Sequence, residues 1–97
     1  YPIQIIDSLE NTYHNSYLFG IISTKRDLLI KKLNDKGIDS HIHFKDCLSW
    51  AKKYGYTSSD CQNLEKNLEK LLFIPNHTIL SKSHLNKINN VFKEVFY

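Results

Sequence analysis

The chain has 97 residues, 41% of them hydrophobic, and a formal net charge of +3 at pH 7. This length supports one domain with a modest core, and no apolar run is long enough to cross a membrane as a helix. The positive charge is small and the lysines are spread along the chain, which favours a solvated surface over a nucleic-acid-binding face.

Two features of the composition bear on where the protein works. Its two cysteines, Cys47 and Cys61, form no CxxC motif, so we expect reduced thiols in a cytoplasmic protein. The chain starts at Tyr1 without a recognisable signal peptide and contains no methionine. We therefore expect a piece of a longer protein, or a processed one.

The first part of the chain predicts a linker followed by a central strand. Over residues 1–13 the isoleucines are interrupted by polar residues, a pattern that predicts a linker with at most a short edge strand. Residues 16–23 are largely apolar on both faces, which predicts a strand in the middle of a sheet. Gly20 within it predicts a bulge or a close approach of another part of the chain.

A helix that ends at a glycine comes next. Thr24 can cap it, with Asp27 completing a capping box, and Gly37 supplies the left-handed residue that ends a helix. After Gly37 the apolar period changes from about 3.6 to about 2, so residues 38–44 predict a strand. The predicted apolar face consists of Ile38, Ser40, Ile42 and Phe44, and the polar face of Asp39, His41 and His43.

The second half of the chain predicts three helices and a short strand. Residues 46–54 have a helical pattern in which Trp50 is the expected core anchor. The remaining segments are a helix over 61–72, a strand at 73–74 and a last helix capped by Ser81 or Ser83. The predicted order is β-α-β-α-α-β-α. The fold class is therefore α+β, with a small, mostly antiparallel sheet of about three strands covered by four helices.

One group of residue types could carry metal chemistry. Asp39, His41 and His43 share a predicted strand face, and Cys47 or His77 could add a fourth ligand. Residues two apart on a strand lie about 6.5–7 Å apart, whereas zinc ligands converge within about 2.0–2.3 Å of the metal. Strand faces carry Asp and His far more often for solubility. We therefore predict a polar sheet face, exposed or covered by another domain, and no metal site.

Four stretches resemble, in order, the DegT-type sugar-nucleotide aminotransferases. KRDLLI at 25–30 and KGIDSHIHF at 36–44 resemble that family's "RDELIxxLKEKGIxTxxHY" segment. The others are YGY at 54–56 ("LGY"), DCQNLEK at 60–66 ("GDFPxAEK"), and LFIPNH at 72–77 with LS at 80–81 ("LSLPLHPxLT"). The family's insertion after its His-Tyr pair is shorter here, where residues 45–50 lead directly to Tyr54.

This resemblance implies a fold type I, pyridoxal-phosphate-dependent enzyme, of which residues 14–97 would form the small C-terminal domain. Residues 1–13 would lead from a large domain. The intact homodimer would transfer an amino group from an amino acid, commonly glutamate, to a keto-sugar nucleotide. In that family the cofactor lysine and the other cofactor-binding residues belong to the large domain. The chain alone is therefore expected to be inert, with no catalytic, cofactor-binding or metal-binding residue.

The resemblance also implies which residues line the mouth of the substrate site. His43 and Phe44 occupy the family's His-Tyr position, and His77 its "PLH" position. For His77 a role in stabilising the turn is the alternative. A different interpretation of the whole chain stays open as well: a free-standing α+β interaction module that binds nucleic acid through lysines and exposed tyrosines. An upstream reading frame of roughly 250 or more residues would favour the enzyme.

Overall fold

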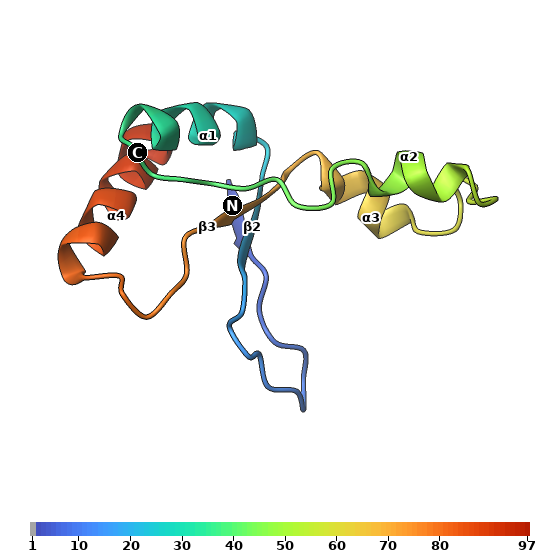
Figure 1. Ribbon diagram of the computed structural model, residues 1–97, viewed down its shortest axis with the longest axis horizontal. Coiled ribbons are helices and arrows are strands. Elements are labelled where there is room, and N and C mark those ends of the chain that lie inside the picture. The colour runs from blue at the N-terminus through green and yellow to red at the C-terminus, as the bar shows by residue number, and fades with distance from the viewer. Residues whose placement is uncertain (1) are drawn as a thin grey trace.

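The computed structural model describes residues 2–97 as one small sheet with helices around it (Figure 1). The three strands are β1 (Ile3–Ile5), β2 (Phe19–Ser23) and β3 (Leu71–Ile74). The four helices are α1 (Arg26–Asp35), α2 (Cys47–Lys52), α3 (Gln62–Leu68) and α4 (Lys82–Phe96). The strands are antiparallel, in the order β1-β2-β3. The α+β class with three strands and four helices is thus confirmed, and β2 is the central strand as predicted.

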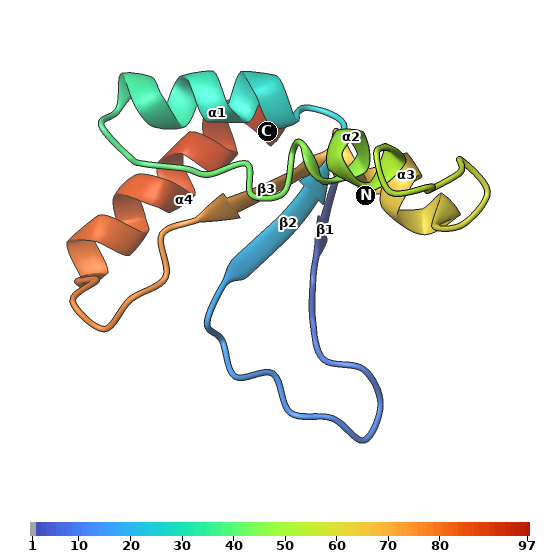
Figure 2. The same cartoon turned by 45° about the vertical axis from the view of Figure 1, so that its right-hand side comes forward.

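The core lies between the sheet and the helices α1 and α4. Ile21 in β2 pairs with Leu72 in β3, and both side chains are buried. The buried cluster consists of Ile21, Leu29, Leu33, Ile38, Leu72, Ile88, Val91 and Val95. Figure 2 shows α1 and α4 lying together beside the sheet, whereas α2 and α3 lie at its other end. We call β1–β3, α1 and α4 the core half, and residues 45–68 with α2 and α3 the α2–α3 lobe.

The start of α1 differs from its predicted capping box. The N-cap residue of α1 is Lys25, whose side chain makes no capping hydrogen bond, and Thr24 lies before the cap. The buried Ser23 hydroxyl accepts from the Lys25 backbone N–H at 3.1 Å and donates to the Pro2 carbonyl at 2.8 Å. Asp27 instead pairs with the neighbouring Arg26 at 2.9 Å. The prediction of Thr24 and Asp27 as a capping box is therefore wrong, because the last residue of β2 ties the turn instead.

The end of α1 follows its prediction, but the strand expected after it does not form. Gly37 has a φ of +68°, the left-handed conformation expected of the residue that ends a helix. Within 38–44 only His41 pairs, by two hydrogen bonds with Phe73 of 3.0 and 2.8 Å. Phe44 has a φ of +63° and is 64% exposed, so it turns the chain out of the extended conformation and away from the core. The third place in the sheet is taken by β1, on the other side of β2.

The α2–α3 lobe contributes little to the core. α2 has no buried residue, and Trp50, expected as a core anchor, is 63% exposed. α3 ends at Leu68, four residues before its predicted end, because Leu71 and Leu72 join β3 and pair with β2. Both helices form where their apolar period predicts them, but α2 buries no residue and α3 buries only Leu68.

The last helix follows its prediction closely. The Ser81 hydroxyl accepts from the His84 backbone N–H, and the His84 ring accepts from the Ser81 backbone N–H, each at 3.2 Å. This reciprocal capping box selects Ser81 over Ser83 as the cap. Three inward residues of the predicted stripe are buried: Ile88, Val91 and Val95. Among the helices of residues 2–97, none is long and apolar enough to cross a membrane.

Candidate functional site

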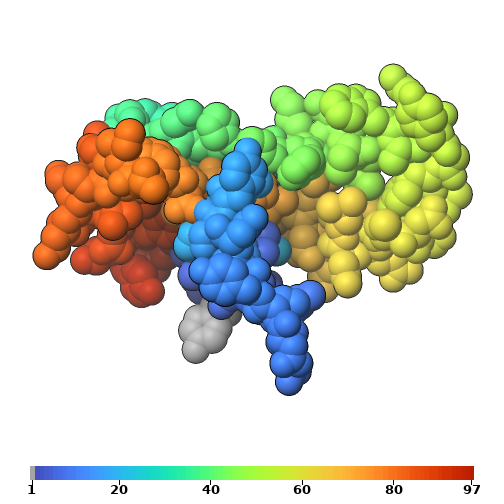
Figure 3. All heavy atoms as spheres, turned by 60° about the horizontal axis from the view of Figure 1, so that its bottom comes forward, coloured from blue at the N-terminus to red at the C-terminus, as the bar shows by residue number. Residues whose placement is uncertain are grey.

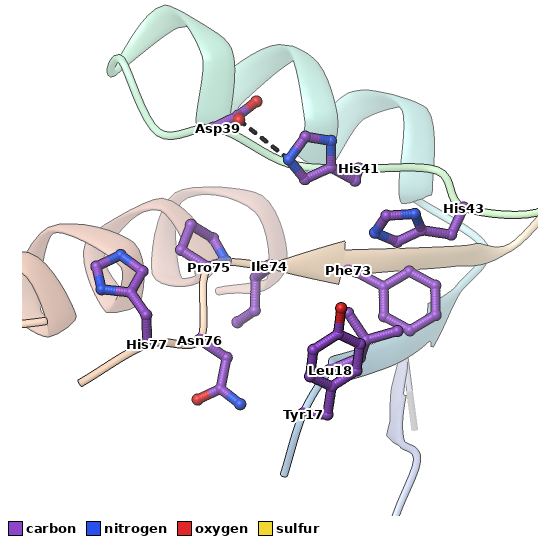
Figure 4. A pocket seen from close by; sticks show the side chains of 10 residues that line it. All are labelled: Tyr17, Leu18, Asp39, His41, His43, Phe73, Ile74, Pro75, Asn76 and His77. Atoms are coloured by element: carbon purple, nitrogen blue, oxygen red, sulfur yellow. Dashed lines mark ion pairs between the residues drawn. The ribbon is translucent and has the colours of Figure 1, made fainter. Parts of the chain in front are cut away.

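A cavity of about 310 Å³ opens where the segment after α1 passes the end of β3. His41 and His43 line it from that segment, and His77 lines it from the loop after β3 (Figure 4). We call it the histidine cavity. Phe73 of β3 lies beside His43, and Tyr17 reaches the cavity from the residues before β2. The pairing of His41 with Phe73 is what holds the histidine segment beside β3. Residues from three separate parts of the chain thus meet in one place.

The polar side of this cavity carries an ion pair between two exposed side chains. His41 Nε2 lies 3.0 Å from Asp39 Oδ2, and these side chains are 60% and 76% exposed. Water screens a pair of this kind, so its contribution to the free energy of folding is small. The pair does orient the His41 ring toward Asp39, as Figure 4 shows.

The apolar side of the cavity depends on Gly20 in β2. The His43 ring lies edge-on to Phe73, with the ring centroids 5.0 Å apart. A Cβ on Gly20 would lie 3.0 Å from Phe73 Cε1 and 2.9 Å from Ile6 Cδ1. Only a residue without a side chain therefore leaves room for the Phe73 ring to approach β2 this closely. The predicted close approach at Gly20 is confirmed, and it sets the ring against which His43 packs.

A hydrogen bond ties two rims of the cavity together. The Asn76 side chain donates to the Ser16 carbonyl, which joins the loop after β3 to the segment before β2. Asn76 and Tyr17 both line the cavity, and neither was a candidate from the sequence. Their only signal in the sequence is indirect, since Asn76 follows Pro75 in a turn and Tyr17 precedes an apolar strand.

The three residues predicted to line a substrate mouth do not stay together. His43 and His77 line the same cavity, but Phe44 is not among its lining residues. The left-handed backbone at Phe44 points its ring into solvent. Two of the three candidates, His43 and His77, therefore line this cavity, whereas Phe44, expected on the apolar face of a strand, is exposed.

The burial of the lysines bears on whether this part of the chain could hold pyridoxal phosphate. A lysine that binds the cofactor covalently must be desolvated to lose its proton, and no lysine in residues 2–97 is buried. No lysine lines the histidine cavity. Lys25, for example, donates to the Val95 carbonyl at 3.0 Å and lies over the Phe96 ring. In the same residues, no group of three or more His, Cys, Asp and Glu side chains could hold a metal ion.

Two solved structures share this fold over nearly the whole chain. One is the sugar aminotransferase CalS13 from Micromonospora echinospora, at 14% identity and a TM-score of 0.79 over 96% of this chain. Another is the putative sugar aminotransferase Spr1654 from Streptococcus pneumoniae in its PMP form, at 24% identity and a TM-score of 0.79 over 97% of this chain. The chain spans about a quarter of each of those proteins, 25% and 26% of their lengths.

Comparison of sequences identifies the family. No protein of curated function is similar enough to count as a match. The sequence model of the DegT/DnrJ/EryC1/StrS aminotransferases, however, matches residues 3–93, nearly the entire chain. The segments around the histidine cavity lie inside that match. The chain therefore belongs to the DegT/DnrJ/EryC1/StrS aminotransferase family.

Proposed function

We propose that this chain is the small C-terminal domain of a pyridoxal-phosphate-dependent aminotransferase. The whole enzyme transfers an amino group from an amino acid such as glutamate to a keto-sugar nucleotide. It works as a cytoplasmic homodimer. The observation that carries this proposal is the family match over residues 3–93, supported by the shared fold with a quarter of two sugar aminotransferases.

In this proposal the small domain supplies no cofactor-binding residue and instead shapes the substrate side of the site. The cofactor lysine comes from the large domain, and this fits the finding that no lysine in residues 2–97 is buried. The histidine cavity then faces the large domain across the active-site mouth. His43, held edge-on by Phe73, and His77 line this mouth, and Phe44 contacts the large domain through its exposed ring.

The test uses the longest reading frame that contains this chain. We expect that frame to encode a protein about four times as long, because the chain covers about a quarter of its structural relatives. The purified protein should transfer an amino group from glutamate to a keto-sugar nucleotide in the presence of pyridoxal phosphate. A protein of that length that binds the cofactor but aminates no keto-sugar nucleotide would contradict the proposed substrate class.

The role of the cavity is tested in the same protein by one histidine substitution. Removing a hydrogen bond to a charged ligand weakens binding by about tenfold or more, so His77→Ala should raise KM for the sugar nucleotide by that factor. The spectrum of the bound cofactor should stay unchanged. His14→Ala is the matched control, because His14 lies outside this cavity. An equal effect of the two substitutions would remove His77 from the substrate mouth.

A further inference from the structure

The α2–α3 lobe is attached to the core half by few interactions. Within residues 2–97, the elements in extensive contact are β1 with β2, β2 with β3 and α1 with α4, and neither α2 nor α3 belongs to such a pair. α2 buries no residue, and α3 buries only Leu68, which lies outside the buried cluster of the core half. Figure 1 shows both helices at the opposite end of the sheet from α4. The lobe is therefore held mainly by interactions within itself.

The joint between the lobe and the core half is hollow. A cavity of about 400 Å³ is lined by Arg26 at the start of α1 and by Leu48, Lys52 and Leu68 of the lobe. A hydrogen bond crosses this joint from Arg26 Nη1 to the Leu68 carbonyl at 3.4 Å, which is longer than the usual range of about 2.7–3.2 Å. Side chains that face a void lose the dispersion contacts of a packed interface. Separating the lobe from the core half therefore breaks few favourable contacts.

A strained residue lies where the lobe begins. Phe44 has a φ of +63°, a conformation that costs a bulky residue free energy. Its ring approaches the His43 ring with the centroids 5.9 Å apart, but it is 64% exposed, so burial does not offset the strain. Lys45, the next residue, is the first of the lobe. A change in the Phe44 backbone would relieve the strain and swing the lobe at the same time.

We propose that the α2–α3 lobe is a hinged unit that opens while the core half stays folded, and that the strain at Phe44 sets how often it opens. Opening also releases His43 from the Phe73 ring, because His43 lies two residues before the lobe. The two hydrogen bonds between His41 and Phe73 keep the preceding part of the segment on β3. One wall of the histidine cavity thus moves with the lobe. This motion is a property of the chain itself and does not depend on the proposed aminotransferase function.

The first test is native-state hydrogen exchange of the 97-residue chain, followed by NMR at low urea concentrations. The reporters in the lobe are amides bonded within its helices, such as Trp50 N–H to the Asp46 carbonyl and Glu65 N–H to the Cys61 carbonyl. They should share one protection factor, at least about a hundredfold lower than that of the β2–β3 amides, because local openings require less free energy than global unfolding. This protection should fall with urea, but less steeply than that of the β2–β3 amides, since less surface is exposed.

A substitution in the core half tests whether the lobe opens on its own. Ile88→Val removes one methylene group from a buried side chain of α4, and should lower the protection of the β2–β3 amides about 2- to 10-fold. The protection of the lobe amides should stay unchanged, because α4 remains folded when the lobe opens. If the lobe amides lose protection by the same factor, the lobe opens only with the whole molecule, and the proposal is overturned.

A matched pair of substitutions tests the hinge. Phe44→Asn and Phe44→Leu introduce side chains of similar size, and both remove the ring contact with His43. Asparagine adopts a positive φ more readily than leucine, so the lobe amides of Phe44→Asn should be about 5- to 30-fold more protected than those of Phe44→Leu. The β2–β3 amides should gain the same factor, because global unfolding relieves the strain as well. Equal protection in the two variants would show that the strain at Phe44 does not control the opening.

The movement of the cavity wall is tested by saturation-transfer NMR on the histidine rings. The urea concentration is chosen so that the exchange data place the open state at about 1% of the molecules, a population this method detects. The His43 ring should then show a minor state with that population. His77 is the matched control, because it lines the same cavity from the loop after β3 and should show none. A His43 ring without this minor state would overturn the link between the lobe and the cavity.

Discussion

The two halves of the molecule carry similar amphipathic helices but use them differently. In the core half, α1 and α4 cover the sheet, and Leu29, Leu33 and Val91 are almost completely buried. In the α2–α3 lobe, α2 buries no residue and Trp50 and Tyr54 are largely exposed. Figure 3 shows the lobe (green to yellow) set apart from α4 (orange to red), with the β1–β2 connection (blue) between them in this view. An apolar stripe at helical spacing thus predicts a helix. Its side chains become buried only where another element packs against that stripe.

The forces that hold the two halves differ accordingly. The core half is stabilised by apolar burial, supplemented by ion pairs of 4.0 and 3.5 Å that join Lys32 and Lys36 of α1 to Glu94 of α4. The lobe depends on local hydrogen bonds, such as that from the Tyr56 hydroxyl to Glu65 at 2.8 Å. Substitutions that remove side chains of similar size should therefore lower the free energy of unfolding by very different amounts in the two halves.

The largest expected effect is in the core half. Leu33→Ala should lower the free energy of unfolding by about 2–5 kcal/mol, because it removes a fully buried side chain and leaves a cavity against α4 and the sheet. Leu28 lies on the same helix but is 45% exposed, so Leu28→Ala should lower the free energy of unfolding far less. Urea denaturation of both variants gives the difference. Equal costs would mean that α1 does not face the sheet as described.

The next effect is at Gly20, where the core half meets the histidine cavity. Gly20→Ala should cost about 1–3 kcal/mol, because the new methyl group overlaps Ile6 and Phe73. It should also weaken the contact between the Phe73 and His43 rings, seen as a loss of NMR cross-peaks between them. Adding Phe73→Leu should recover part of the stability. A fully stable Gly20→Ala with unchanged cross-peaks would contradict the close packing at this glycine.

A smaller effect is expected from the largest side chain of the lobe. Trp50→Ala should change the free energy of unfolding by no more than about 0.5 kcal/mol, because the side chain is 63% exposed. The measurement is the same denaturation experiment as for Leu33→Ala. If the two substitutions prove equally costly, the lobe is part of the core and the comparison between the halves fails.

The smallest effect is a titration within the lobe. Burial, and then the hydrogen bond to Glu65, raise the pKa of Tyr56 to about 12 from 10.0. The protonated phenol is therefore favoured in the folded state, and this contribution is complete below about pH 10 and is lost as the pH rises toward 12. The difference in tyrosinate absorbance between the native protein and Tyr56→Phe should show one phenol that ionises late. An ordinary titration of that phenol would indicate that the bond to Glu65 is open in solution.

Much of the fold could be predicted because the deciding interactions are local in sequence. The positive φ at Gly37, the cap at Ser81 and the buried stripe of α4 all follow from neighbours within one or two helical turns. The central position of β2 follows from its two apolar faces. The strand expected over 38–44 does not form, because pairing is settled between distant segments. The segment makes a single bridge to β3, from His41 to Phe73, and Phe44 with its positive φ then turns the chain away.

In the candidate site, too, some residues could be predicted from the sequence and others could not. His43 and His77 could be named from motif positions, and the cavity does contain both. Tyr17 and Asn76 could not, because the bond from Asn76 to Ser16 joins residues that are 60 positions apart. The outward direction of Phe44 could not be predicted either, since a bulky residue rarely adopts a positive φ. What the sequence lacks is the information on which distant segments meet.

We propose above that this domain shapes the substrate side of an aminotransferase while the large domain holds the cofactor. The most direct measurement is to incubate the chain with pyridoxal phosphate, reduce it with borohydride and map the modified lysines by mass spectrometry. The account predicts partial labelling spread over several exposed lysines, because no lysine in residues 2–97 is buried. Stoichiometric labelling of a single lysine would contradict it, since that lysine would be a cofactor site within this domain.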